Sequence, residues 1–237
     1  MKWSQMTEVG LVRKKNEDSL CVVPDLALFA VADGMGGHQA GEVASRIAVE
    51  SVSRRIRNGS NDEAVKSLLE GVRLANSKIY SASRDKPTYR GMGTTLTAAV
   101  IREKELILAH VGDSRAYIIR GNKIYPLTED HSLVQEMFRH GGITKEQARD
   151  HPHRNVLTRA LGTDPLVDVD LIRIKLEKGD ILLLCTDGLS GLLEDDEMLR
   201  LVREAAHPDQ AVQGLVSEAM KRGGSDNISV IVVEIDG

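Results

Sequence analysis

Strand-like and helical segments occur in blocks along this chain, and their order limits the folds that it can adopt. Short apolar runs come first, followed by two amphipathic helical patterns near residues 40–56 and 64–79. Further strand-like runs lie at 94–101, 106–111 and 116–119, and the last third combines strands with another helix pair. Grouped strands and consecutive helix pairs favour α+β layers over a doubly wound βαβ sheet.

Several strand-like runs, such as 106–111 and 181–185, are apolar at nearly every position. This pattern is typical of strands covered on both faces. We therefore predict an α-β-β-α architecture, in which a central β-sandwich of two antiparallel sheets is flanked by pairs of helices. We expect residues 1–237 to form a single domain. The loosely patterned stretch at about 130–162 is predicted to be a surface insertion with small helices.

Composition excludes several classes of function. The formal net charge is -4, and the densest basic run, at 54–57, lies on a helical pattern and is interpreted as a solvated face. No apolar stretch reaches the roughly 18 residues of a membrane helix, and the N-terminus has no signal-peptide core. Cys21 and Cys185 lie in apolar runs, as in a reduced protein. We expect a cytoplasmic protein with no nucleic-acid partner and no membrane insertion in this chain.

Four aspartates stand at the ends of apolar, strand-like runs that are far apart in the sequence. They are Asp33, Asp113, Asp187 and Asp226. Asp187 follows a predicted strand and Asp226 precedes one, so antiparallel pairing of those strands would bring both carboxylates to one sheet edge. Each aspartate alone would be interpreted as an ordinary turn residue. Four together predict a cluster of negative charge, which cations must neutralise.

Neighbouring residues fit such a cation site. Glycines flank the aspartates, where a tight backbone or an exposed carbonyl ligand is useful. Glu17 and Asp18 add carboxylates near the N-terminal edge. Thr94 and Thr95 lack the lysine of a phosphate-binding P-loop, and we interpret them as a strand start with a tight backbone approach near the site. Oxygen ligands without a nearby cysteine favour hard cations, so we expect Mn²⁺ or Mg²⁺.

Six short motifs occur in order along the chain. They are Arg13-x-x-Asn16-Glu17-Asp18, Asp33-Gly34-Met35-Gly36-Gly37-His38, Gly91-Met92-Gly93-Thr94-Thr95, Gly112-Asp113-Ser114-Arg115, Thr186-Asp187-Gly188-Leu189 and Ser225-Asp226-Asn227-Ile228. Each motif alone is weak, but six in register are specific. With this set the chain resembles the metal-dependent serine/threonine protein phosphatases of the PPM (type 2C) family, in their bacterial form. The resemblance implies the same sandwich fold, with residues 130–162 as a variable flap whose histidines are not ligands.

The resemblance also implies how two core metal ions would be held. Asp33 would bridge both ions, and the carbonyl of Gly34 would bind the second. Asp187 and Asp226 would complete the coordination of the first ion. Glu17 would act largely through coordinated water. Two cations that share a water lower its pKa, which supplies a nucleophile without a serine or cysteine.

Three further roles follow from the resemblance. Asp113, together with Asp187, would hold a third, weaker ion. Arg13 would clamp the substrate phosphate, because its fork binds two oxygens at once. From spacing alone, Arg13 would be an ordinary solvated residue. His38 would protonate the leaving serine oxygen, although it could instead hydrogen-bond a metal-bound water or begin the next helix.

The implied activity is metal-dependent hydrolysis of phosphoserine and phosphothreonine in proteins by direct attack of a metal-bridging water. It would reverse serine/threonine kinase signalling in a bacterium. The implied partners are phosphorylated proteins, with a serine/threonine kinase as one candidate, and we expect a monomer. Two alternatives are weighed against this activity. A non-catalytic phosphoprotein-binding domain on the same fold is disfavoured because all four aspartates are present. A metal nuclease is disfavoured by the acidic charge balance and the lack of a basic groove. The chain could also be the catalytic domain of a longer, membrane-anchored protein.

Overall fold

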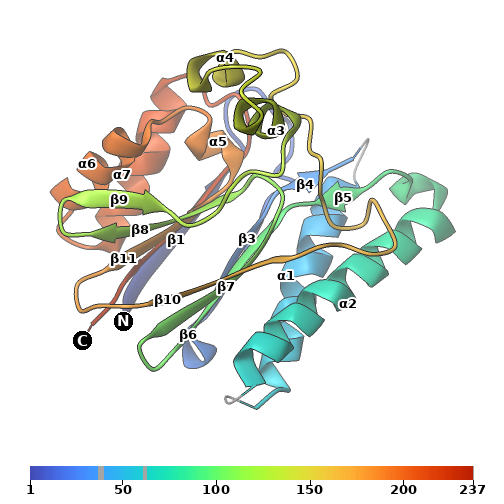
Figure 1. Cartoon of the computed structure of the whole chain (residues 1–237), viewed down its shortest axis with the longest axis horizontal. Coiled ribbons are helices and arrows are strands. Elements are labelled where there is room, and N and C mark those ends of the chain that lie inside the picture. Colours follow the sequence, from blue (N-terminus) through green and yellow to red (C-terminus); the bar gives the residue numbers. More distant parts are fainter. Residues whose placement is uncertain (37–39, 61–62, 237) are drawn as a thin grey trace.

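Two five-stranded antiparallel sheets form the centre of the molecule (Figure 1). The computed structural model describes residues 1–236 apart from 37–39 and 61–62. The first sheet contains, in order, β1 (Lys2–Glu8), β12 (Ile228–Glu234), β11 (Ile181–Cys185), β8 (Arg115–Arg120) and β9 (Lys123–Pro126). The second contains β10 (Asp170–Lys175), β7 (Glu105–Val111), β6 (Leu96–Arg102), β3 (Leu28–Ala32) and β2 (Ser19–Val23). A separate ladder pairs β4 (Gly34–Met35) with β5 (Gly93–Thr94).

A pair of long helices covers the outer face of each sheet (Figure 1). Helices α1 (Gly41–Arg57) and α2 (Ala64–Asp85) pack on the second sheet. Helices α6 (Asp195–Glu204) and α7 (Pro208–Lys221) pack on the first. This arrangement confirms the predicted α-β-β-α class.

Three apolar layers hold these elements together, and β3 shows why its sequence does not alternate. All five of its residues are buried. Phe29 and Val31 pack between the two sheets, whereas Leu28, Ala30 and Ala32 pack against α1 and α2. A strand that lies between two layers needs apolar residues on both faces.

Two elements differ from the sequence-based expectation. Strand β1, which the apolar pattern did not predict, is a largely exposed edge strand that pairs along its whole length with β12. This pairing places the two ends of the chain close together (Figure 1). The predicted strand at 94–101 is interrupted at Thr95, whose amide donates to the carbonyl of Asp33.

The 130–162 segment crosses the end of the sandwich that lies away from the termini (Figure 1). It contains α3 (Leu133–Arg139) and α4 (Lys145–Arg149). Thr144 and Gln147 form a capping box at the start of α4. No helix within the described residues is both long and apolar enough to cross a membrane.

Candidate active site

One cavity of about 560 Å³ opens at the end of the sandwich beside the 130–162 segment. Its wall includes every described residue with an implied metal-binding or phosphate-binding role: Arg13, Glu17, Asp33, Gly34, Asp113, Asp187 and Asp226. Asp18, the other carboxylate expected near the site, does not line the cavity. His38 lies outside the described residues. The fold therefore brings together side chains as far as 213 positions apart.

The strand order explains this convergence. β11 and β12 pair antiparallel, with Cys185 opposite Val230, so the end of one strand meets the start of the other. Asp187, which begins the short helix α5 (Asp187–Ser190), and Asp226 lie just beyond that pair. In the second sheet, β3 and β7 both pair antiparallel with β6. Both strands therefore end at the same sheet edge, which brings Asp33 and Asp113 together.

The clustered carboxylates disfavour one another's ionised form. Burial raises the pKa of Asp33 well above its usual value, and the charges of Asp18, Asp187 and Asp113 raise it further. Burial, followed by the charge of Asp187, has the same effect on the pKa of Asp113. Burial and the charge of Asp226 raise the pKa of Asp187. A divalent cation among these groups would offset both the burial and the repulsion.

Two buried carboxylate oxygens have no hydrogen-bond partner in the described part of the chain: Oδ1 of Asp18 and Oδ1 of Asp187. The other oxygen of Asp18 accepts a 2.8 Å hydrogen bond from Thr186 Oγ1, yet burial raises the pKa of Asp18 to about 7. Such oxygens suit hard cations, which bind carboxylates and carbonyls. No three acidic, histidine or cysteine side chains among the described residues already form a closed metal cage. The site is therefore an open cluster of oxygen donors.

Arg13 lies at this cluster and is its paired cation. Its Nη2 donates a 2.7 Å hydrogen bond to Oδ2 of Asp226, and this bond is the main cause of the raised pKa of Arg13. About half of the Arg13 side chain is exposed (52%). A guanidinium carries five N–H donors, so the bond to Asp226 leaves others for an incoming anion.

Asn227 fixes the segment that carries Arg13 and Glu17. Its Nδ2 donates to the carbonyls of Val9 and Lys15, at 2.9 and 2.8 Å. Its Oδ1 accepts from the amide of Glu17 at 2.8 Å. One side chain thus holds the N-terminal loop against the start of β12.

Gly34 allows this loop to come close to helix α1. The Gly34 amide donates to the carbonyl of Glu17 at 3.1 Å. A Cβ at position 34 would lie only 2.2 Å from the carbonyl oxygen of Gly41, the first residue of α1. A glycine is therefore needed after Asp33 because three segments meet there, in addition to any role of its carbonyl.

Thr94 and Thr95 hold both backbone polar groups of Asp33. Thr95 Oγ1 accepts from the Asp33 amide at 2.8 Å, and Thr94 Oγ1 donates to the Asp33 carbonyl at 2.8 Å. Thr95 Oγ1 also shares a 2.7 Å hydrogen bond with the hydroxyl of Ser114, the neighbour of Asp113. One threonine hydroxyl therefore connects the two loops that carry Asp33 and Asp113.

Thr95→Val should weaken Mn²⁺ binding by about 10–100-fold, because groups that orient metal ligands typically have effects of this size. It should also destabilise the protein by about 1–3 kcal/mol, since the Asp33 amide loses its buried partner. Thr95→Ser keeps the hydroxyl and should retain Mn²⁺ affinity within a few-fold. Calorimetric Mn²⁺ titration of both variants measures the difference. Equal affinities for the valine and serine variants would contradict this positioning role.

The sequence as a whole matches known proteins. The sequence model of the family Protein phosphatase 2C matches residues 13–222. The serine/threonine phosphatase stp of Listeria monocytogenes serotype 4b is 38% identical over 237 residues, which cover 97% of this chain and 94% of the relative. The chain belongs to the protein phosphatase 2C family.

Solved structures of the phosphatase 2C type share the fold. The crystal structure of the Mycobacterium tuberculosis serine/threonine phosphatase PstP/Ppp has a TM-score of 0.93 and 35% identity, covering 100% of this chain and 99% of that chain. The catalytic domain of the serine/threonine protein phosphatase PstP in complex with two manganese ions has a TM-score of 0.92 and 34% identity, with coverages of 100% and 98%.

In this phosphatase 2C chain, His131 holds the backbone next to Asp113 in place, a role that the sequence pattern did not predict. His131 is buried, and its Nδ1 accepts a 3.0 Å hydrogen bond from the amide of Gly112, next to Asp113. Gly112 has a φ of +108°, and a Cβ there would lie 2.6 Å from the side chain of Thr95. The glycine before Asp113 is therefore the one sequence signal of this close packing.

Proposed function

We propose that this chain is a metal-dependent phosphatase that hydrolyses phosphoserine and phosphothreonine in proteins. The observation that carries the proposal is the single cavity in which Asp33, Asp113, Asp187 and Asp226 converge beside Arg13. Family membership supports the same activity, because the relatives are serine/threonine phosphatases by name. The complex of a structural neighbour with two manganese ions supports Mn²⁺ or Mg²⁺ as cofactor and two core ions. A third, weaker ion is proposed on the sequence resemblance alone.

The proposed metal ligands are all oxygen donors of residues on the cavity wall. The core ions would be held by Asp33, the Gly34 carbonyl, Glu17, Asp187 and Asp226, and the third ion by Asp113 with Asp187. When bound, these ions would supply activated water for direct, in-line attack on phosphorus. The chain's own residues position these donors, through Thr95 on Asp33 and Asn227 on Glu17. Arg13 would bind and orient the phosphoryl group, because its fork matches two phosphate oxygens.

A phosphopeptide assay tests this function. Phosphate release from a phosphothreonine peptide should require Mn²⁺ or Mg²⁺ and should stop after thorough chelation. Activity that survives chelation would overturn the mechanism. Mn²⁺ binding without turnover on any phosphopeptide would instead favour a non-catalytic binding domain. Nicking of plasmid DNA by the Mn²⁺-loaded protein would favour a nuclease.

Arg13→Ala should raise KM for a phosphopeptide by about tenfold with a smaller change in kcat, because a charge-assisted phosphate contact is lost. The KM of Arg13→Lys should lie between those of the wild type and the alanine variant, since a lysine provides a point charge without the bidentate fork. Steady-state kinetics at saturating Mn²⁺ separate KM from kcat. An unchanged KM in the alanine variant would show that Arg13 only pairs with Asp226.

His38 is proposed as the general acid on the strength of the sequence resemblance. His38→Ala should lower kcat by about 10²-fold for an alkyl phosphate, which needs a proton on its leaving oxygen. The loss should be much smaller for p-nitrophenyl phosphate, whose leaving group needs no proton. Equal losses on both substrates would argue against a general acid and for a role in holding metal-bound water.

We further propose that residues 1–237 act as one phosphatase domain, with the 130–162 segment as its flap. We also propose a monomer that works in the cytoplasm on phosphorylated proteins, with a serine/threonine kinase as one candidate substrate. Analytical ultracentrifugation tests the monomer. Dephosphorylation of an autophosphorylated serine/threonine kinase, compared between the wild type and Asp33→Asn, tests the kinase.

A further inference from the structure

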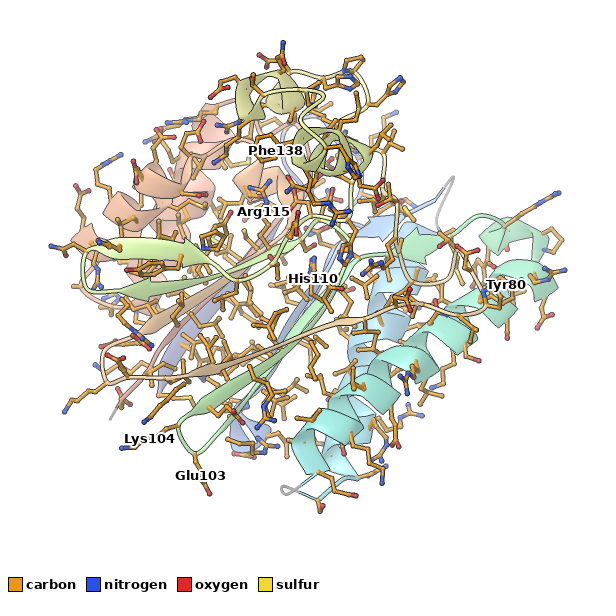
Figure 2. The ribbon with its side chains drawn as sticks, viewed as in Figure 1. Tyr80, Glu103, Lys104, His110, Arg115 and Phe138 are labelled. Carbon is orange, nitrogen blue, oxygen red and sulfur yellow. The ribbon has the colours of Figure 1, made fainter. Side chains whose placement is uncertain are left out.

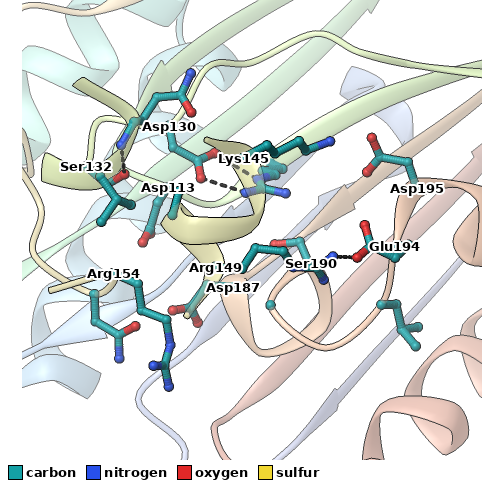
Figure 3. Close-up of a pocket in the computed structure, with 17 residues that line it drawn as sticks. Asp113, Asp130, Ser132, Lys145, Arg149, Arg154, Asp187, Ser190, Glu194 and Asp195 are labelled. Carbon is teal, nitrogen blue, oxygen red and sulfur yellow. Dashed lines mark hydrogen bonds and ion pairs between the residues drawn. The ribbon is translucent and has the colours of Figure 1, made fainter. Parts of the chain in front are cut away.

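A second cavity, of about 170 Å³, lies between the 130–162 segment and the body of the molecule (Figure 3). It adjoins the active site, because Asp113, Asp187 and Asn155 belong to the walls of both cavities. Its volume is below the roughly 300–1,000 Å³ of ordinary small-molecule pockets. The space therefore suits one side chain of a substrate whose phosphoryl group lies at the catalytic carboxylates.

Two of the four cationic side chains on its walls are already paired. Nε and Nη2 of Arg115 donate to the two carboxylate oxygens of Asp130, each at 2.8 Å. Arg149 in α4 forms an ion pair with Glu194, the residue before α6. These pairs neutralise their charges within the wall and connect it to the body of the fold.

The other two cations, Lys145 and Arg154, come from α4 and from the loop after it (Figure 3). Neither side chain has an ion-pair or hydrogen-bond partner among the residues that the structure describes. Apart from the catalytic carboxylates, the remaining anion of the wall is Asp195. Asp195 begins α6, where the helix dipole already favours its negative charge. The wall therefore has two cations available for a negative ligand.

We infer that this second cavity is a specificity subsite for an acidic side chain of the substrate, either a carboxylate or a second phosphoryl group, near the residue to be dephosphorylated. The inference rests on the proposed phosphatase function and deepens it. Lys145 and Arg154 bind the acidic group through charge-assisted hydrogen bonds. Val134 and Leu193, also in the wall, contact its apolar part. Substrates with two nearby negative groups are then preferred over isolated phosphorylation sites.

A peptide scan tests the subsite. The parent is a phosphothreonine peptide with alanine and glycine flanks, and each variant carries one aspartate at a single position on either side. At one position, or two adjacent ones, aspartate should raise kcat/KM of the wild type by about 5–20-fold. A second phosphoserine at that position should raise it at least as much. Free inorganic phosphate added to the parent peptide should give no increase, because it is not tethered to the substrate.

The measured quantity is the ratio of kcat/KM for the acidic and neutral peptides, so a general loss of activity cannot imitate the effect. In Lys145→Gln/Arg154→Gln this ratio should fall to about 1. In Lys145→Glu/Arg154→Glu a lysine at the sensitive position should become the preferred residue. The matched control Lys104→Gln/Arg90→Gln removes two exposed charges elsewhere and should keep the wild-type ratio. Figure 2 places Lys104 at the far end of the sandwich.

The outcomes separate this inference from the proposed function. If the wild type with Mn²⁺ does not hydrolyse the neutral peptide or any acidic variant, the phosphatase function itself fails. If it hydrolyses the neutral peptide but the aspartate scan is flat, the subsite alone is overturned. A preference that persists in Lys145→Gln/Arg154→Gln also overturns it. If free phosphate stimulated hydrolysis of the neutral peptide, the second cavity would be an effector site for phosphate and not a substrate subsite.

Discussion

Asp33→Asn should lower kcat/KM on a phosphopeptide by about 10³-fold or more, because an amide cannot supply the negative charge needed to hold two cations and their activated water. The same change should stabilise the metal-free protein. Burial and the neighbouring carboxylates raise the pKa of Asp33, so its ionised form is unfavourable in the fold. Removing that charge should contribute on the order of 1 kcal/mol, or about 2–4 °C in Tm. Activity and stability therefore change in opposite directions.

Asp168→Asn is the matched control, because Asp168 is an exposed aspartate outside both cavities. It should change Tm by less than about 1 °C and leave kcat/KM near the wild-type value. Thermal unfolding with chelator and phosphate release with Mn²⁺ provide the two measurements. If Asp33→Asn retained a tenth of the activity, or lowered the Tm of the metal-free protein, Asp33 would not be a repelled metal ligand.

Stabilisation by Mn²⁺ should grow as the pH rises from about 5 to 8. Because the site's carboxylate pKa values are raised in the metal-free fold, the folded protein binds protons more tightly than the unfolded chain does. Their contribution to stability is fully present below the pKa of a carboxylate in the unfolded chain, near 4. It is lost as the pH rises through the pKa in the fold, which is about 7 for Asp18. Mn²⁺ binds the deprotonated groups, so it replaces the protons over the same range. At pH 8 and 1,000 times its dissociation constant, Mn²⁺ should add about 4 kcal/mol, or about 10 °C.

The comparison must be made with and without Mn²⁺ at each pH, because His110 has the opposite effect. Burial lowers the pKa of His110 to about 4. Its neutral form therefore stabilises the fold above pH 6.5, and this contribution is lost as pH falls toward 4. The His110 contribution cancels in the difference between the two metal states. A Mn²⁺-induced shift of equal size at pH 5 and pH 8 would show that the ions bind elsewhere.

The sequence predicts the cluster of aspartates because strand ends can be recognised locally. Non-alternating runs identify strands with two covered faces, and antiparallel pairing then places Asp187 near Asp226. The same logic brings Asp33 and Asp113 to one edge, since both follow strands that pair with β6. The helix pairs could be predicted as well, because each has a periodic apolar face.

The side chains that hold the cluster in place could not be predicted in the same way. Thr95 and Asn227 reach partners 62 and 210 positions away, through single hydrogen bonds that leave no period in the sequence. The loose apolar pattern of residues 130–162 predicts a surface flap, yet His131 within it is buried against Gly112. Strand β1 was missed because an exposed edge strand needs few apolar residues; only Ser4 in it is buried.

The pairing of β1 with β12 determines where any fused domain, tag or surface tether would leave the molecule. The terminal ammonium of Met1 forms an ion pair with Asp236, so both ends exit at neighbouring points. That exit lies a full strand length from the acidic cavity, since β1 runs from Lys2 to Glu8 before the loop to Arg13 begins. A bulky attachment at either end would therefore lie away from the cavity mouth.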